Sequence, residues 1–176
     1  MPVESHPSPW IIEPLGKHHN RADFSCGQEV LDRYLKKQAS QDARRLVAAP
    51  FILVHESDHK TIVGYYTLSA LSINIQDLPE DIIKKLPTYP MMPVTLLGRL
   101  AVDRRYQCQG AGEFLLVNAL QRAFMQSSQI AAMAVVVDAI DEQAVRFYRH
   151  FEFIAFPDKP RRLFLPMKTV ANLFTN

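Results

Sequence analysis

The sequence predicts one α/β (α+β) domain in which a mixed sheet carries helices on its faces. Two observations lead to this fold class. Strand-like and helix-like segments alternate after residue 95, which is typical of a sheet whose strands are connected by covering helices. Earlier in the chain, strand-like runs at 51–55 and 61–70 flank a polar turn and predict an antiparallel hairpin. With 176 residues, the chain is expected to form a single domain over residues 1–176.

The composition is that of an ordinary globular protein, with 48% hydrophobic and 22% charged residues and a net charge of +2. Two cysteines are too few for a disulfide framework, and the six histidines lack the spacing of a zinc site, so no metal is predicted. No apolar run approaches the length of a membrane span, and the N-terminus lacks the pattern of a signal peptide. We therefore expect a cytoplasmic protein that does not bind a membrane.

The first part of the chain predicts a strand and a helix. Residues 1–9 are rich in Pro and Ser and are expected to be mobile, and a strand begins at Trp10 and stops near Pro14. The pattern Ser25-x-x-Gln28 has the form of a capping box and predicts a helix after it. If that helix is continuous, Arg33, Lys37 and Arg44 line one face, either as a functional stripe or as an ordinary solvated surface; a break near Gln41 would separate them.

The remaining elements follow from apolar runs and breakers. Residues 77–86 predict a short helix, and the Pro-containing segment 88–93 predicts the flexible wall of a substrate cleft. After the strand ending at residue 102 and the helix through residue 123, the later elements are expected as follows: a buried strand at 130–137, a helix at 141–150, strands at 153–156 and 162–167, and a polar tail at 169–176.

The stretch LGRLAVDRRYQCQGAGEFLL, residues 97–116, contains a buried strand, a basic glycine-containing turn and the start of a helix. This arrangement suits an anion, because glycines allow the backbone to approach closely and the first N–H groups of the helix point at the ligand. Arg104 and Arg105 add positive charge to the same turn.

Three phosphate-binding patterns were compared with this turn. A Walker loop is excluded because Glu113 and Phe114 follow the last glycine, and a dinucleotide fingerprint is weak because position 115 is Leu. The pattern Gln/Arg-x-x-Gly-x-Gly/Ala is filled by Gln107, Gly110 and Gly112. It is the pyrophosphate-binding signature of the GNAT acyltransferases. The alternative is a glycine-rich turn that merely caps a buried helix.

Three further blocks extend this resemblance. They are VGYYTLSA (63–70), AVVVDAIDEQAVRFYRHFEF (134–153) and RRLFLPM (161–167), in the order of the family. From about Phe24 to Met167 the chain resembles the aminoacyl-tRNA acetylating toxins, a branch of the GNAT family. The resemblance implies the GNAT fold, a mixed and mostly antiparallel sheet that splays apart between the Leu100 strand and the Val136 strand to admit acyl-CoA, with acetyl-CoA as co-substrate and no metal.

The resemblance also implies which residues bind the co-substrate. Backbone groups of Leu100, Ala101 and Val102 would pair with the pantetheine arm as an added strand would. The pyrophosphate would be held by the turn, through Gln107, Cys108, Gln109, Gly110, Ala111 and Gly112. Two positions differ from the usual pattern of the branch, because Cys108 and Glu152 stand where glycine is usual. If position 108 requires a positive φ, Cys108 strains the loop, and Glu152 would shift the catalytic helix slightly.

Tyr148 is the predicted general acid. A phenol with a pKa of about 10 is nearly matched to a thiolate leaving group, and the family places its acid in this motif. Without the resemblance, the favoured interpretation of Tyr148 is a core aromatic beside Phe147 and Phe151. No general base stands out among Asp138, Glu142 and His150, which favours an α-amine acceptor, since its pKa near 8 leaves it partly neutral.

The leading hypothesis is an N-acetyltransferase that modifies aminoacyl-tRNA and blocks translation. Its predicted tRNA-binding residues are basic: Arg33, Lys37, Arg44, Arg45, Arg99, Arg161 and Arg162, with Lys36 and Lys159 as further candidates. The alternatives are a GNAT enzyme that acetylates a small amine or a protein, and a non-catalytic acyl-CoA-binding regulatory module. By resemblance we also expect a ribbon–helix–helix antitoxin as partner and a homodimer.

Overall fold

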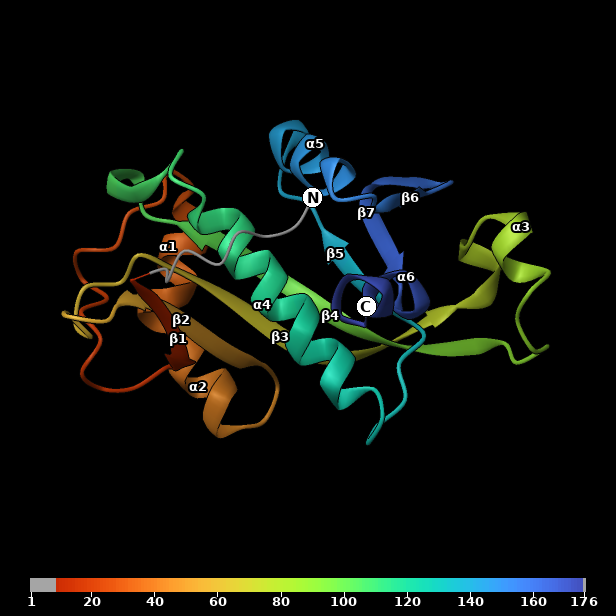
Figure 1. The fold of residues 1–176 in the computed structure, drawn as a ribbon, viewed down its shortest axis with the longest axis horizontal. Coiled ribbons are helices and arrows are strands. Elements are labelled where there is room, and N and C mark those ends of the chain that lie inside the picture. Colours follow the sequence, from red (N-terminus) through yellow and green to blue (C-terminus); the bar gives the residue numbers. More distant parts are fainter. Residues whose placement is uncertain (1–8, 176) are drawn as a thin grey trace. The chain divides into compact units, whose positions relative to one another are not determined.

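The computed structural model describes residues 9–175 (Figure 1). Its strands are β1 (Trp10–Pro14), β2 (Ala49–His55), β3 (Gly64–Asn74), β4 (Met91–Val102), β5 (Ala134–Asp138), β6 (Ile154–Phe156) and β7 (Lys159–Pro166). Its helices are α1 (Glu29–Lys37), α2 (Ala39–Arg44), α3 (Glu80–Ile83), α4 (Ala111–Gln126), α5 (Glu142–His150) and α6 (Met167–Phe174), with 3₁₀ turns η1 (Ile75–Asp77) and η2 (Arg104–Tyr106).

The seven strands form one sheet in the order β1-β2-β3-β4-β5-β7-β6. The pairs β1–β2, β5–β7 and β6–β7 are antiparallel, whereas β4 and β5 run parallel, with Thr95 opposite Val135 and Leu97 opposite Val137. The sheet is therefore mixed and mostly antiparallel, which confirms the predicted fold class.

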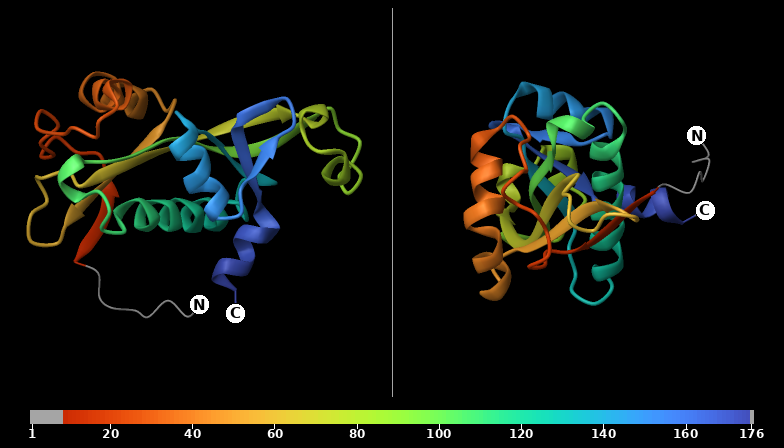
Figure 2. Two further views of the ribbon diagram at one scale, coloured as in Figure 1. Left: turned by 90° about the horizontal axis from the view of Figure 1, so that it is seen from above. Right: turned by 90° about the vertical axis from the view of Figure 1, so that its left-hand side faces the viewer.

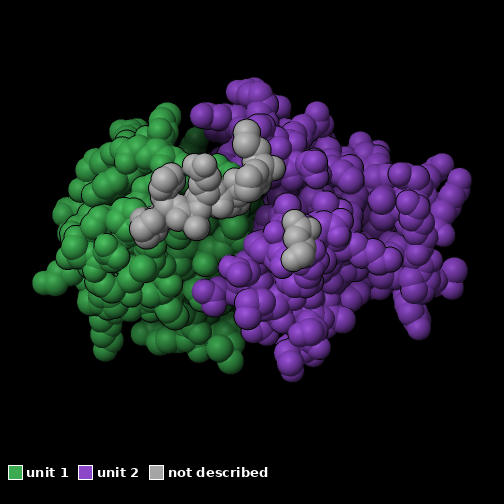
Figure 3. Space-filling model, in the orientation of Figure 1, with its two compact units in different colours: residues 1–67, 99–118 green, residues 68–98, 119–176 purple. Residues whose placement is uncertain are grey.

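The chain divides into two compact units (Figure 3). Unit 1 contains residues 1–67 and 99–118, and unit 2 contains residues 68–98 and 119–176. Strands β3 and β4 and helix α4 each contribute residues to both units. The single domain over the whole chain stays a prediction.

In unit 1, both faces of the sheet are covered, and α1 and the first part of α4 lie on opposite faces (Figure 2). Neighbouring residues of β3 point to opposite faces. The Tyr65 ring packs with Phe24 and Tyr34 on the side of α1, and its hydroxyl donates to the Leu31 carbonyl at 2.7 Å. Tyr66 stacks on Phe51 and donates to Asn118 Oδ1 of α4 at 2.5 Å. This double coverage explains why the start of β3 is continuously buried.

Unit 2 has its own apolar core around β5, of which Ala134 to Val137 are all buried. The core cluster on one face joins β5 to β3, β4, β6 and β7, through Ile73, Ile75, Leu78, Met92, Val94, Ala134, Val136, Phe156 and Phe164. A strand that has neighbours on both edges and is covered on both faces has a continuous apolar, often β-branched sequence. The sequence of β5 has this pattern, which is why the strand could be predicted.

The predicted capping box is wrong, and the condition for a basic stripe, a continuous helix, is not met. Helix α1 begins at Glu29 after Gln28, so Ser25 is not its N-cap. The helix ends at Lys37, and α2 begins at Ala39 after a break at Gln38 (φ −119°, ψ −33°). Arg33 and Lys37 therefore share α1, while Arg44 belongs to a second helix.

Several predicted boundaries also move. The helix expected at 77–86 is η1 followed by the short α3, and the strand expected from residue 130 begins at Ala134. The segment 88–93 is a shorter interruption, because β4 already begins at Met91 and contains Pro93. The polar tail contains helix α6, which buries Met167 and Val170. Of the N-terminal segment predicted to be mobile, residues 1–8 lie outside the described residues, while the Pro9 carbonyl accepts a hydrogen bond from Glu56 N–H at 2.7 Å.

None of the described helices is both long and apolar enough to cross a membrane.

Candidate active site

The predicted anion-binding turn has the expected strand–turn–helix form. Strand β4 ends at Val102, and α4 begins at Ala111. Gly110 has a φ of +84°, and a Cβ built on it would meet no atom within 4 Å, so the space above it is open. The Phe114 N–H donates to the Gly110 carbonyl at 3.0 Å. Since a helix leaves its first amides without intrahelical acceptors, the N–H groups of residues 111–113 are available to an anion.

Cys108 has the positive φ that the sequence raised as a concern, at +61°. A left-handed conformation costs a non-glycine residue about 1–2 kcal/mol, so the loop carries strain that glycine would not. The Cys108 side chain is exposed. The turn keeps the conformation despite the cysteine because contacts on both sides hold it.

One of these contacts is Asp103, which the sequence reasoning missed. Its side chain is only 2% exposed and accepts hydrogen bonds from the Arg105 N–H and Nε, both at 2.9 Å, and from the Ser25 N–H at 3.1 Å. Burial alone would raise the pKa of Asp103, but these hydrogen bonds outweigh it and hold the pKa below its ordinary value. Asp103 therefore fixes the start of the turn, and it neutralises Arg105 rather than leaving that charge for a ligand.

The segment before α1 forms the other side of the clamp. The Gln107 amide donates to the carbonyls of Cys26 and Val102, each at 2.9 Å, and Arg104 N–H donates to the Ser25 carbonyl at 2.9 Å. Gln107 of the signature thus ties the turn to its neighbours through its side chain. The only sequence signal for this arrangement was an acidic residue directly after a buried strand in a basic turn.

Tyr148 lies in the last part of α5, whose N-cap Asp141 accepts a hydrogen bond from Ala144 N–H at 2.8 Å. The tyrosine is 6% exposed, and its ring contacts Phe147 and Phe153, each with 5.3 Å between centroids. Phe151, which the sequence placed beside Tyr148, contacts Phe147 instead. Burial raises the pKa of Tyr148, so the hydroxyl keeps its proton at neutral pH.

The end of α5 holds Tyr148 in place. Glu152 has a φ of +70°, and its N–H donates to the Arg149 carbonyl at 3.0 Å. The Phe153 N–H donates to the Tyr148 carbonyl at 3.2 Å, which completes a Schellman motif with Glu152 at its left-handed position. The contact between the Tyr148 and Phe153 rings is the apolar contact that accompanies this motif. Glu152 therefore stands where glycine fits best.

The acidic candidates for a general base are engaged with arginines. Asp138 accepts two hydrogen bonds from Arg162, at 2.8 and 2.9 Å, across paired positions of β5 and β7. Glu142 Oε1 lies 3.5 Å from Arg161 Nε. His150 is exposed at the end of α5, with its ring against Phe151. This arrangement agrees with an acceptor that needs little help to lose its proton.

The same charged side chains border a pocket of about 460 Å³ in unit 2. It is lined by Asp138, Ala139, Glu142, Lys159, Pro160, Arg161 and Arg162. Because three of these residues are basic and two are acidic, the pocket has a mixed rather than a strongly positive lining.

The predicted tRNA-binding residues fall into two sets. Arg161 and Arg162 belong to β7 in unit 2, where Arg162 is already paired with Asp138. The set in unit 1 consists of Arg33, Lys37, Arg44, Arg45 and Arg99. Arg99 of β4 comes to this set from far along the chain, and its guanidinium lies 3.4 Å from the centre of the Tyr34 ring. Lys37, Arg44 and Arg45 are exposed, whereas Arg33 pairs with Glu29 one turn away.

Known proteins are similar to this chain in sequence and in fold. A sequence model described as the Acetyltransferase (GNAT) family matches residues 16–153. A probable toxin TacT of Sinorhizobium fredii is 32% identical over 171 residues, which cover 93% of this chain and 94% of the relative. A tRNA-acetylating toxin of Mycobacterium tuberculosis is 35% identical over 145 residues, which cover 82% and 84% of the two chains.

Among solved structures, AtaT complexed with acetyl-methionyl-tRNAfMet is 30% identical with a TM-score of 0.86, and the match covers 94% of this chain and 99% of that one. The crystal structure of a tyrosine-to-phenylalanine mutant of KacT is also 30% identical, with a TM-score of 0.89 and coverage of 95% and 100%.

Proposed function

Because the chain belongs to the GNAT family and is therefore an acetyl-CoA-dependent acetyltransferase, we propose that its acceptor is the α-amino group of an aminoacyl-tRNA. Acetylation of that amine would block translation, which makes the protein a toxin. The observation that carries this proposal is the similarity over most of the chain to a tRNA-acetylating toxin and to AtaT, which has been solved in complex with acetyl-methionyl-tRNAfMet.

The proposed reaction uses few groups of the protein. The amine attacks the thioester carbonyl, so that a C–N bond forms and the C–S bond breaks. The departing thiolate takes the proton of the Tyr148 hydroxyl, and Tyr148 regains a proton from water, which has received the proton lost by the amine. The amides of residues 111–113 hold the pyrophosphate of acetyl-CoA, and the backbone of 100–102 holds its pantetheine arm.

The pKa of the acceptor amine supports an α-amino group rather than a lysine side chain. An α-amino group with a pKa near 8 is partly neutral at physiological pH, whereas a lysine side chain with a pKa near 10.4 depends strongly on a base. Asp138 and Glu142 face arginines, so an acceptor that is already partly neutral suits this site better.

The exposed basic residues Arg44 and Arg45, at the end of α2, would hold the tRNA phosphates. Arg161 would serve the same purpose beside the pocket in unit 2. Arg162 is the weakest candidate because its charge is compensated by Asp138.

The assembly is proposed from relatives. AtaT has been solved bound to the C-terminus of the antitoxin AtaR, and KacTA has been solved with DNA. We therefore extend the proposal to a toxin that acts in the cytoplasm as a homodimer, with a ribbon–helix–helix antitoxin as its partner.

Turnover on different acceptors tests the function. The purified protein is mixed with acetyl-CoA and a pool of charged tRNAs, uncharged tRNA, free amino acids or a lysine-rich protein, and free CoA thiol is measured. The proposal expects thiol release and N-acetyl-aminoacyl-tRNA only with charged tRNA. Turnover on free amines or protein would favour another GNAT activity, and acetyl-CoA binding without turnover on any acceptor would favour a regulatory module. In cells, overexpression that leaves growth and translation unchanged would contradict a toxin.

A further inference from the structure

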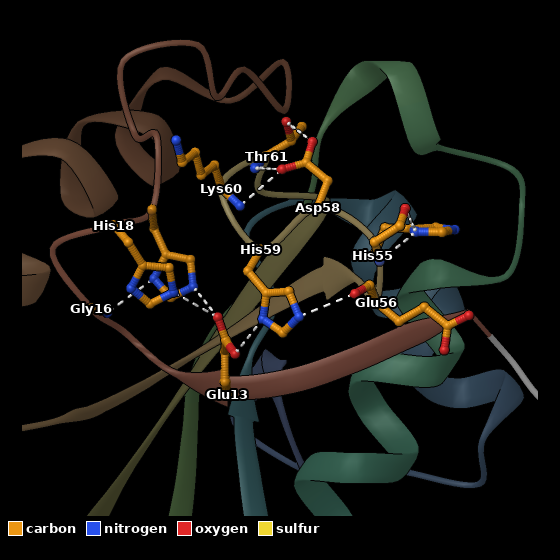
Figure 4. A network of polar contacts seen from close by, with 11 residues as sticks. Glu13, Gly16, His18, His55, Glu56, Asp58, His59, Lys60 and Thr61 are labelled. Atoms are coloured by element: carbon orange, nitrogen blue, oxygen red, sulfur yellow. Dashed lines mark hydrogen bonds and ion pairs between the residues drawn. The ribbon is translucent and has the colours of Figure 1, made fainter.

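One edge of unit 1 gathers three histidines around a single carboxylate (Figure 4). Glu13 belongs to β1, His18 and His19 to the loop after it, and His59 to the turn between β2 and β3. Glu13 Oε1 lies 2.8 Å from His18 Nε2 and 2.7 Å from His19 Nε2. Glu13 Oε2 lies 3.0 Å from His59 Nδ1. None of these residues has a part in the acetyl transfer described above.

We propose that Glu13, His18 and His19 form a binding site for a divalent transition-metal ion of the zinc class. One ligand atom from each residue lies within 4.8 Å of the other two. Zinc bound tetrahedrally at 2.0–2.2 Å sets neighbouring ligand atoms about 3.3 Å apart, which small side-chain movements reach from here. Two imidazoles and a carboxylate suit zinc, copper or nickel, whereas Mg²⁺ and Ca²⁺ take oxygen ligands. Solvent supplies the fourth ligand.

Gly16 allows the two histidine rings to lie side by side over the loop. A Cβ at Gly16 would lie 2.7 Å from both Cε1 and Nδ1 of His18, so only glycine lets this ring lie over the loop. The His18 and His19 rings are 4.0 Å apart between centroids, and both present Nε2 to the same oxygen. The His19 side chain is fully buried, whereas 49% of the His18 side chain is exposed, so an ion reaches the buried ligand from the His18 side.

His59 completes the surroundings of the site. Its Nε2 lies 3.2 Å from the Glu56 carbonyl oxygen while its Nδ1 faces Glu13 Oε2. A neutral imidazole donates to only one of these two oxygens. In the tautomer that donates from Nδ1, His59 holds the second oxygen of the carboxylate and leaves Oε1 to the ion, as hydrogen-bonding partners of ligating carboxylates do. His59 is a positioning residue in this proposal.

Metal binding would change the position of the proton on the His19 ring. The Gly16 N–H donates to His19 Nδ1 at 2.9 Å, so the proton of this neutral ring lies on Nε2. When the ion takes the Nε2 lone pair, that proton moves to Nδ1 and the Gly16 hydrogen bond opens. Metal binding therefore has a signature at the Gly16 amide.

Calorimetry on the full chain, stripped with a chelator and titrated with ZnCl₂ in buffer containing MgCl₂, tests the site. We expect one zinc ion per chain. His18→Gln and Glu13→Gln should each weaken binding by at least about 10–100-fold, the scale seen when a residue that only orients a ligand is lost. The matched control is His55→Gln, which changes a half-buried histidine that contacts Ser57, and it should bind zinc as the unchanged chain does.

Two further measurements separate binding from folding. Zinc should raise the melting temperature relative to chelator, and this rise should be lost in His18→Gln, whose side chain is half exposed so that the fold tolerates the change. In an amide NMR spectrum, zinc should shift the Gly16 resonance. Zinc affinity that is equal in all variants, or no binding up to about 100 µM zinc, would overturn the proposal. Loss of acetyl transfer with zinc binding intact would contradict only the proposed function.

Discussion

Burial raises the pKa of the Tyr148 hydroxyl, and this bears directly on the proposal that Tyr148 is the proton donor. A raised pKa keeps the phenol protonated before the reaction but makes its proton harder to release. Proton transfer from Tyr148 is therefore easier if bound acetyl-CoA changes the surroundings of the hydroxyl and lowers this pKa. The ring packs on Phe147 and Phe153, which gives it a structural role as well.

Tyr148→Phe separates the two roles because it removes one hydroxyl and keeps the ring. If Tyr148 is the general acid, kcat should fall about 100-fold or more while acetyl-CoA affinity barely changes. Stopped-turnover assays and calorimetry measure these quantities. Near-normal kcat with only a small shift in melting temperature would leave Tyr148 as a core aromatic.

The two cysteines differ in a way that reports on the anion-binding turn. Burial, followed by a hydrogen bond involving Asp32, raises the pKa of Cys26 to about 11, whereas Cys108 is exposed beside Gln107 in the turn. At pH 8 only about one Cys26 thiol in a thousand is ionised. An alkylating agent should therefore label Cys108 much faster than Cys26, as followed by mass spectrometry.

Acetyl-CoA should slow the labelling of Cys108 and leave that of Cys26 unchanged, so Cys26 serves as an internal control. Equal labelling rates of Cys108 with and without acetyl-CoA would argue that the pyrophosphate is bound elsewhere.

At the scale of elements, α2 and α5 end in the same way. In α2, Leu46 has a φ of +58°, its N–H donates to the Ala43 carbonyl at 3.2 Å, and Val47 N–H donates to the Asp42 carbonyl at 2.9 Å. This is the Schellman motif that Glu152 completes after α5. The chain thus contains two equivalent Schellman motifs. The one after α5 lies next to Tyr148, and the one after α2 can serve as its control.

Substitutions at these two positions test whether the end of α5 positions Tyr148. Glycine at either position should stabilise the fold by about 1 kcal/mol, or about 2–4 °C in Tm, because it removes left-handed strain. Valine at either position should destabilise the fold, since β-branched residues resist a positive φ. Only Glu152→Val should also lower kcat, because only that strain is felt at Tyr148. An equal loss of kcat in Leu46→Val would contradict this positioning role.

At the scale of the whole molecule, the sequence predicted the elements wherever local signals dominate. The β-branched run at Val135 to Val137 and the motif Gln107/Gly110/Gly112 are both local, and the structure has a strand and a strand–turn–helix there. A break near Gln41 was considered, but its position at Gln38 could not be fixed because no Gly or Pro marks it. Pro93 was misjudged because proline lacks only the N–H, and its carbonyl still accepts from Met133 N–H at 2.9 Å.

The contacts that sequence reasoning missed are long-range. Asp103 meets Ser25 across 78 positions, and Glu13 meets His59 across 46. Spacing along a chain says nothing about such pairs, because the fold alone brings the segments together. The same limit applies to the predicted tRNA-binding residues, because the sequence does not show which basic side chains are paired with acidic ones in the fold.

Net charge is only +2, so tRNA binding depends on where uncompensated positive charge lies. Arg162 is held by Asp138, and Arg99 stacks on Tyr34, whereas Arg44 and Arg45 are exposed at the end of α2. The adjacent Lys84 and Lys85 after α3 are also exposed and carry the same charge. They provide a matched control for general electrostatics.

The double variant Arg44→Gln/Arg45→Gln should raise KM for charged tRNA roughly tenfold at moderate salt, because each lost phosphate contact removes counterion release. Acetyl-CoA affinity and kcat at saturating tRNA should not change, since neither residue belongs to the anion-binding turn. The salt dependence of KM should become shallower by about one or two in log–log slope.

Lys84→Gln/Lys85→Gln changes net charge equally and should leave KM and slope near their original values. If both double variants raise KM to the same extent, the effect is one of net charge, and α2 is not part of the tRNA-binding surface.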